Sequence, residues 1–107
     1  MINALFFKDK NEHLKGFHID GHAGDADWGY DIVCAGVSSA VELAANLATD
    51  FLGLDAKAAV KGGGVMFKLN SDPDGAGDKV LLALADHLAR IAQGHPGRIK
   101  IEFRNAV

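Results

Sequence analysis

Hydrophobic and polar residues alternate toward both ends of the chain, which is typical of β-strands that bury one face. The apolar segment 2–8 is followed by a polar turn and then by segment 14–21, in which Phe17 and Ile19 point to the same side. These two segments predict an antiparallel hairpin. Segment 98–104 alternates isoleucine and phenylalanine with charged residues and predicts a closing strand.

Two stretches instead show the three-to-four-residue period of an amphipathic helix. Residues 31–52 form the first, with a predicted buried stripe of Val33, Val37, Ala40, Ala44, Leu47 and Phe51. Asp31 is a reasonable N-terminal cap or first-turn residue, and Gly53 a plausible stop. Residues 78–93 form the second, with a predicted inner face of Leu81, Leu84, Ala85, Leu88 and Ala92.

A glycine-rich turn lies between these two helices. Segments 57–61 and 65–69 flank Gly62-Gly63-Gly64 and predict a second hairpin. The element order is therefore ββαββαβ. This order predicts an α+β fold, a mostly antiparallel sheet with two helices packed on one face, in a single domain over 1–107.

Composition narrows the functional classes. The chain has 107 residues, 49% hydrophobic and 23% charged, with net charge −3, which fits one folded domain rather than a disordered chain. A pI near 5.9 argues against a nucleic-acid partner. The single cysteine excludes an internal disulfide. No uninterrupted apolar run approaches membrane-spanning length, and no targeting signal is evident. We expect no membrane association and a reducing cytoplasmic setting.

The single cysteine is the first candidate for chemistry. Cys34 falls in the first turn of the helix predicted from Asp31, where free N–H groups and the helix dipole favour a negatively charged sulfur. The alternative is a small buried hydrophobe. Ser38 lies four residues on, on the same flank. It either donates a hydrogen bond to the substrate or the sulfur, or is a solvated serine.

A histidine precedes the cysteine by twelve positions. Residues 21–30 lack periodicity and read as a loop, and His22 at its start is placed to accept the thiol proton. A solvated loop histidine is the alternative. Asp31 either caps the helix or orients His22, as the third member of a triad does. The loop and its ends carry four aspartates, which attract a basic substrate but oppose a thiolate: Asp20, Asp25, Asp27 and Asp31.

Patterns for metals and cofactors fail when compared with this sequence. The segment from Asp25 lacks the glycine and the glutamate of a calcium loop, and 62–64 lacks the lysine of a phosphate loop. A zinc site made of His18, His22 and Cys34 matches no strong spacing. We therefore expect no metal and no cofactor, with His13, His87 and His95 on the surface.

Residues 21–41, GHAGDADWGYDIVCAGVSSAV, resemble the ribosomal-processing cysteine protease family Prp. Gly21-His22, the Asp-Ile-Val-Cys-Ala run at 31–35 and Val37-Ser38 match the family pattern, as does the spacing from histidine to cysteine. Gly36 replaces the more usual alanine. Outside this stretch the resemblance is one of length and element order.

The resemblance implies a cytoplasmic, homodimeric endopeptidase that removes the N-terminal extension of ribosomal protein twenty-seven of the bacterial large subunit, cutting after an aromatic residue. It assigns Cys34 as nucleophile and His22 as general base and acid, with Asp31 and Ser38 in supporting roles. First-turn N–H groups would stabilise the oxyanion, and the glycine loop would close over the peptide. The substrate-binding candidates are Gly21, Gly24, Trp28, Gly29 and Tyr30.

Two other functions stay open from the residues alone. A non-catalytic ribosome-associated module would use the acidic surface to dock a basic ribosomal protein. A redox-sensing protein would use the thiol without cutting any peptide.

Overall fold

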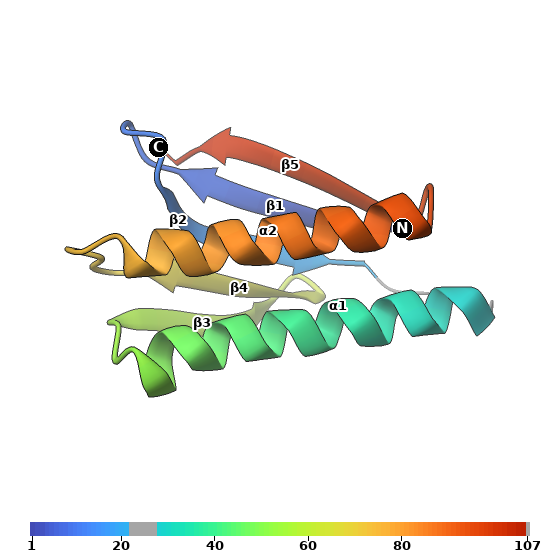
Figure 1. Ribbon diagram of the computed structural model, residues 1–107, viewed down its shortest axis with the longest axis horizontal. Coiled ribbons are helices and arrows are strands. Elements are labelled where there is room, and N and C mark those ends of the chain that lie inside the picture. The colour runs from blue at the N-terminus through green and yellow to red at the C-terminus, as the bar shows by residue number, and fades with distance from the viewer. Residues whose placement is uncertain (22–27, 107) are drawn as a thin grey trace.

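The fold was examined in a computed structural model, which describes residues 1–21 and 28–106, and the side chains in those ranges except at 28–31. Figure 1 shows the course of the chain. Its elements are β1 (Ile2–Lys8), β2 (Leu14–Asp20), α1 (Trp28–Asn46), the π-helical turn η1 (Leu47–Phe51), β3 (Ala56–Lys61), β4 (Gly64–Leu69), α2 (Ala76–Gly94) and β5 (Ile99–Asn105). The predicted ββαββαβ order is confirmed.

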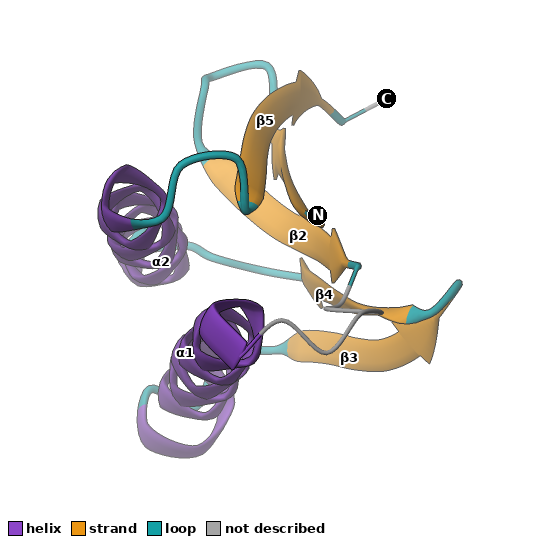
Figure 2. Cartoon of the chain, turned by 90° about the vertical axis from the view of Figure 1, so that its right-hand side faces the viewer, coloured by secondary structure: helices purple, strands orange, loops and turns teal. Residues whose placement is uncertain are grey.

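The strands form one sheet in the order β3-β4-β2-β1-β5. The β1–β2 and β3–β4 hairpins are antiparallel, as predicted, and β2 pairs antiparallel with β4. Among the described residues, β1 and β5 form the one parallel pair. Both helices lie on the same side of the sheet (Figure 2). The opposite face carries no helix in the described part of the chain.

Aromatic rings form the centre of the core between the sheet and the helices. Phe6, Phe17 and Phe67 are at most 1% exposed, and the ring centroids of Phe17 and Phe67 lie 5.4 Å apart. These residues come from three adjacent strands, because alternation places one side chain in two toward the helices. The alternation predicted for β2 is confirmed.

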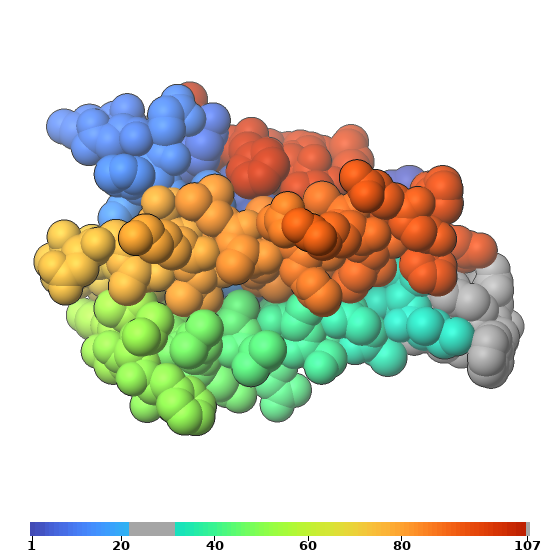
Figure 3. All heavy atoms as spheres, in the orientation of Figure 1, coloured from blue at the N-terminus to red at the C-terminus, as the bar shows by residue number. Residues whose placement is uncertain are grey.

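Helix α2 is anchored at its start by carboxylates. The Asp72 carboxylate accepts hydrogen bonds from the Gly77 and Asp78 N–H groups, both at 2.9 Å, and Asp78 Oδ1 accepts one from the Leu14 N–H at 2.6 Å. These bonds satisfy free N–H groups of the first turn and tie α2 to β2. Helix α2 then runs along β2 and β5, while α1 packs chiefly against α2. Figure 3 shows the two helices side by side on the surface.

Helix α1 departs from the prediction at both ends. It begins at Trp28 rather than Asp31, so the predicted loop is shorter. At its other end the chain widens into η1, where the Leu52 N–H donates to the Leu47 carbonyl at 2.9 Å. An i to i+5 bond rotates the following residues around the axis. Leu47 and Phe51, predicted to be buried, are 38% and 81% exposed.

The segment Ile32–Phe51 meets the length and hydropathy criteria for a membrane-spanning helix, with mean hydropathy 1.5 over 20 residues. The core helix of a folded domain meets the same criteria. Its inner residues Val33, Val37 and Ala48 lie in the core formed with the sheet, so this finding is weak support for a membrane span.

Candidate active site

A cavity of about 510 Å³ opens between α1 and the β3–β4 hairpin. It exists because α1 packs against α2 rather than closely against the strands beneath it. Its lining comes from α1, from the end of β2, from the hairpin and from the start of β1: Ile2, Ile19, Asp20, Gly21, Cys34, Val37, Ser38, Val41, Glu42, Ala45, Asn46, Val60, Gly63, Gly64 and Val65.

Cys34 lies on the wall of this cavity. It follows Val33, which is 1% exposed, and its own side chain is half-buried against the core. The thiol is therefore packed against the core on one side and faces the cavity on the other.

The predicted location of Cys34 in the first helical turn is wrong. Since α1 begins at Trp28, Cys34 is its seventh residue. In a regular α-helix the N–H groups beyond the first turn are already bonded to carbonyls, so they are not free to bind an oxyanion. The prediction failed because Trp28, Gly29 and Tyr30 have loop-like composition but extend the helix by one turn.

The same extension changes the assignment of Asp31. Its backbone is the fourth residue of α1, so it is a first-turn residue and not the N-terminal cap. The predicted position of Ser38 on the same flank as Cys34 is confirmed. It lies one turn after Cys34, is exposed, and lines the same cavity.

Gly21 directly follows β2 and also lines the cavity. Its φ of +91° lies in the left-handed region, and a Cβ there would overlap the Met1 carbonyl oxygen. Glycine is therefore required by both backbone conformation and close approach. In the sequence, His22 directly follows Gly21. His22 and Gly24 themselves lie outside the described residues.

Sequence reasoning did not identify most of the apolar walls of the cavity. Val37 and Val41 contribute from α1, and Val60 and Val65 contribute from the hairpin. The Gly62-Gly63 turn, with φ of +61° and +80°, has the positive values of a tight two-residue hairpin. Its sequence indicated a turn, but its position beside α1 depends on how the sheet and helix pack.

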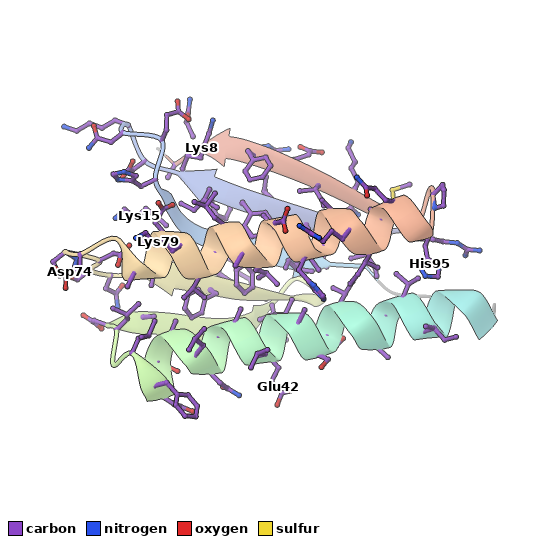
Figure 4. All side chains as sticks on the ribbon, in the orientation of Figure 1. Lys8, Lys15, Glu42, Asp74, Lys79 and His95 are labelled. Atoms are coloured by element: carbon purple, nitrogen blue, oxygen red, sulfur yellow. The ribbon has the colours of Figure 1, made fainter. Side chains whose placement is uncertain are left out.

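Charged groups lie at the cavity edge. Asp20 is half-buried, and its Oδ2 lies 3.6 Å from His18 Nδ1, while His18 Nε2 lies 3.0 Å from the Lys61 carbonyl oxygen. Glu42 projects from α1 on the side away from α2 (Figure 4). Among the described residues, no group of three histidine, cysteine or acidic side chains is arranged to hold a metal ion. The predicted surface positions of His13, His87 and His95 are confirmed.

The chain was compared with known families and proteins. Residues 1–100 match the family model described as cysteine protease Prp. No curated protein matched the sequence.

Solved structures show the same fold. The ribosomal processing protease Prp of Staphylococcus aureus in complex with a substrate peptide superposes with a TM-score of 0.86 at 18% identity, covering 96% of this chain and 99% of the other. The same protease with a covalently linked product peptide gives 0.84 at 20% identity, with the same coverage. A Streptococcus mutans protein gives 0.78 at 24% identity, covering 99% and 96%.

Proposed function

The chain belongs to the Prp cysteine protease family and is a cysteine protease, and from this premise we propose which residues act and on what. The proposed activity is endopeptidase cleavage that removes the N-terminal extension of ribosomal protein twenty-seven of the bacterial large subunit. The peptide bond that is cut lies directly after an aromatic residue, and Cys34 and His22 act as a catalytic dyad.

The observation that carries this proposal is the half-buried thiol of Cys34 on the wall of a large apolar cavity. A peptide cleaved after an aromatic residue needs an apolar recess beside the nucleophile. The valines at 37, 41, 60 and 65 line such a recess. A volume of about 510 Å³ is within the range of ligand sites and accommodates several residues of an extended peptide.

The proposed chemistry proceeds in two steps. His22 removes the Cys34 proton, the thiolate attacks the scissile carbonyl carbon, and the C–N bond breaks as His22 protonates the leaving amine. A thioester remains on Cys34. His22 then deprotonates a water molecule, which attacks the thioester and regenerates the thiol. The product peptide described as covalently linked in the Staphylococcus aureus relative is consistent with such an intermediate.

The path of the chain supports the choice of His22. Gly21 and Cys34 line the same cavity, and His22 is the next residue after Gly21. Because the N–H groups around Cys34 are not those of a first turn, thiolate formation in this proposal depends on His22 rather than on the helix dipole.

The remaining assignments are proposed with supporting roles. Asp31 orients His22, Ser38 donates a hydrogen bond within the site, and the peptide lies against Gly21, Gly24, Trp28, Gly29 and Tyr30. The relatives named for ribosomal processing support a ribosomal protein precursor as the partner. We further propose that residues 1–107 form one protease domain that acts in the cytoplasm as a homodimer.

The direct test is incubation of the protein with N-terminally extended ribosomal protein twenty-seven, with products read by mass spectrometry. The parent protein is expected to release the extension after an aromatic residue. Cys34→Ala and His22→Ala are each expected to lose essentially all cleavage, because the nucleophile and its base act as one unit.

A matched pair of serines separates the supporting role from a general effect on α1. Ser38 lines the cavity, whereas Ser39 faces the groove between the two helices. Ser38→Ala is expected to slow cleavage, and Ser39→Ala to leave it unchanged. Undiminished cleavage by Cys34→Ala would refute the assigned nucleophile. An uncut precursor with the parent protein would refute the assigned substrate.

A further inference from the structure

The face of the sheet opposite the helices, here called the free face, carries most of the strand lysines. Strand register sorts its side chains into rows that cross the sheet. One row runs Lys57, Lys68, Gly16, Phe7 and Arg104. The next row runs Ala59, Met66, His18, Leu5 and Glu102, and the third runs Lys61, Gly64, Asp20, Asn3 and Lys100.

The free face is basic although the whole chain is acidic. Its rows hold five lysine or arginine residues and two carboxylates, which gives +3 with His18 neutral, against −3 for the full sequence. Glu102 pairs with Lys100 at 3.0 Å and with Arg104 at 3.2 Å. Among the described residues, Lys57, Lys61 and Lys68 form no ion pair, so the β3–β4 side holds the uncompensated charge.

The pairing of Lys57 with Lys68 has no structural benefit. The two residues lie directly opposite on β3 and β4, where like charges destabilise a sheet. Lysines on an edge strand discourage edge-to-edge aggregation, which accounts for Lys57 and Lys61 on β3. It does not account for Lys68, because β4 lies inside the sheet between β3 and β2.

Apolar side chains lie between these cations. Phe7, Leu5 and Met66 are half-buried on this face. Gly16 stands opposite Phe7 and between it and Lys68, so no side chain at that position covers the ring. An aromatic ring flanked by cations on an open sheet face suits a ligand that has both phosphates and planar bases.

We propose that the free face binds single-stranded RNA, with Lys57, Lys61 and Lys68 on the phosphates and Phe7 stacked on a base. The acidic pI, which predicts no nucleic-acid partner, is an average that conceals this distribution. A second copy of the chain is disfavoured as occupant, because a symmetric contact would place the lysines against one another. The proposal concerns the face opposite the cavity and does not require cleavage.

The experiment measures binding of a fluorescein-labelled single-stranded RNA to the full chain by anisotropy, over a series of salt concentrations. The parent protein is expected to bind with a log–log salt slope of about −2, as for three phosphate contacts on a single strand. The triple variant Lys57→Gln, Lys61→Gln, Lys68→Gln is expected to lose affinity by tenfold or more.

A second triple variant removes the same charge elsewhere. Lys10→Gln, Lys79→Gln and Arg90→Gln change exposed cations of the β1–β2 turn and of α2, on which Figure 4 labels Lys79, and are expected to leave affinity within about twofold. Phe7→Leu keeps an apolar side chain and is expected to weaken binding by roughly fivefold through lost stacking. Far-UV circular dichroism checks that each variant is folded.

Three results would overturn the proposal. One is the absence of RNA binding at low salt. Another is an equal loss of affinity in the two triple variants, which would indicate only a response to net charge. The third is binding to anionic phospholipid vesicles or to an acidic peptide in preference to RNA. Loss of RNA binding in the Lys57, Lys61 and Lys68 triple variant, with peptide cleavage intact, would support RNA binding by the free face. It would leave the proposed protease function unaffected.

Discussion

The molecule has two halves, one with α2 over β2 and β5 and one with α1 beside β3 and β4, and their helices have the same length but bury different side chains. Helix α2, over β2 and β5, buries three leucines, Leu81, Leu84 and Leu88, each at most 4% exposed. Helix α1, beside β3 and β4, buries only valines and alanines along its inner stripe. Long side chains fill the space between helix and sheet, whereas short ones leave it open. The half with α2 is therefore closed, and the half with Cys34 contains the cavity.

The same division extends to the free face. Under α2, the charges of β5 are paired around Glu102. Under α1, the lysines of β3 and β4 form no ion pair within the described chain. The α1 half thus has an open apolar cavity on one surface and, on the other, lysines without an ion pair among the described residues, which is the expected property of surfaces that bind something else.

The comparison predicts its largest effect in the packed half. Leu88→Ala truncates a side chain on the inner face of α2 that is fully buried, and is expected to lower the free energy of unfolding by about 2–5 kcal/mol. Val41→Ala, on the side of α1 that lines the cavity, removes two methyl groups and is expected to lower the free energy of unfolding by roughly 1.6 kcal/mol or less. Urea unfolding measures both values. Equal losses would contradict the claim that only one half is tightly packed.

A substitution that fills the cavity should separate activity from stability. Ala45 lines the cavity on α1, and Ala45→Leu is expected to lower kcat/KM for the extended precursor by about 10- to 200-fold, because the added atoms occupy the peptide site. Stability should change little, since the space is open. Ala83→Leu makes the same change on exposed α2 and serves as the control. If both variants cleave normally, the cavity is not the peptide site.

Strand structure was largely predictable because alternation is a strong local signal. In β2, Phe17 and Ile19 face the core as predicted, and both hairpins have the expected pairing. The inner face of α2 was predictable for the same reason, since its leucines stand out against polar neighbours. Ala92, the last member of that face, is partly buried.

The faces of α1 were harder to predict because its sequence is apolar nearly all round. Val41 and Ala48 are buried although neither belongs to the predicted stripe, whereas Leu47 and Phe51 belong to it and are exposed. The π-helical turn η1 shifts the register only at this end of the helix. The pairing of Cys34 with Ser38 on one flank followed from helical spacing alone. The hairpin wall with Val60 did not, because it depends on how far α1 stands from the sheet.

A smaller effect is expected at the end of the cavity. Gly21→Ala places a methyl group against the Met1 carbonyl oxygen at φ +91° and is expected to cost about 1–3 kcal/mol, with reduced cleavage because the chain to His22 is displaced. Gly53→Ala has a similar φ of +64° with nothing within 4 Å, so it reports the conformational cost alone. A loss no larger than that of Gly53→Ala would show that the close approach at Gly21 is unimportant.

The smallest effect concerns the paired charges of β5. The Lys100 ammonium, which contacts the Glu102 carboxylate, and the Arg104 guanidinium lower the pKa of Glu102 below its ordinary value. A lowered folded-state pKa stabilises the fold above about pH 4, the ordinary range of a glutamate, and the gain is lost as pH falls through the lowered value. Glu102→Gln is therefore expected to unfold slightly more readily at neutral pH and to converge with the parent in acid. Because the Glu102 carboxylate is exposed, added salt should remove most of the stability difference between Glu102→Gln and the parent at neutral pH. A difference that persists in salt would mean that the β5 charges are shielded from solvent, which contradicts their position on the open face.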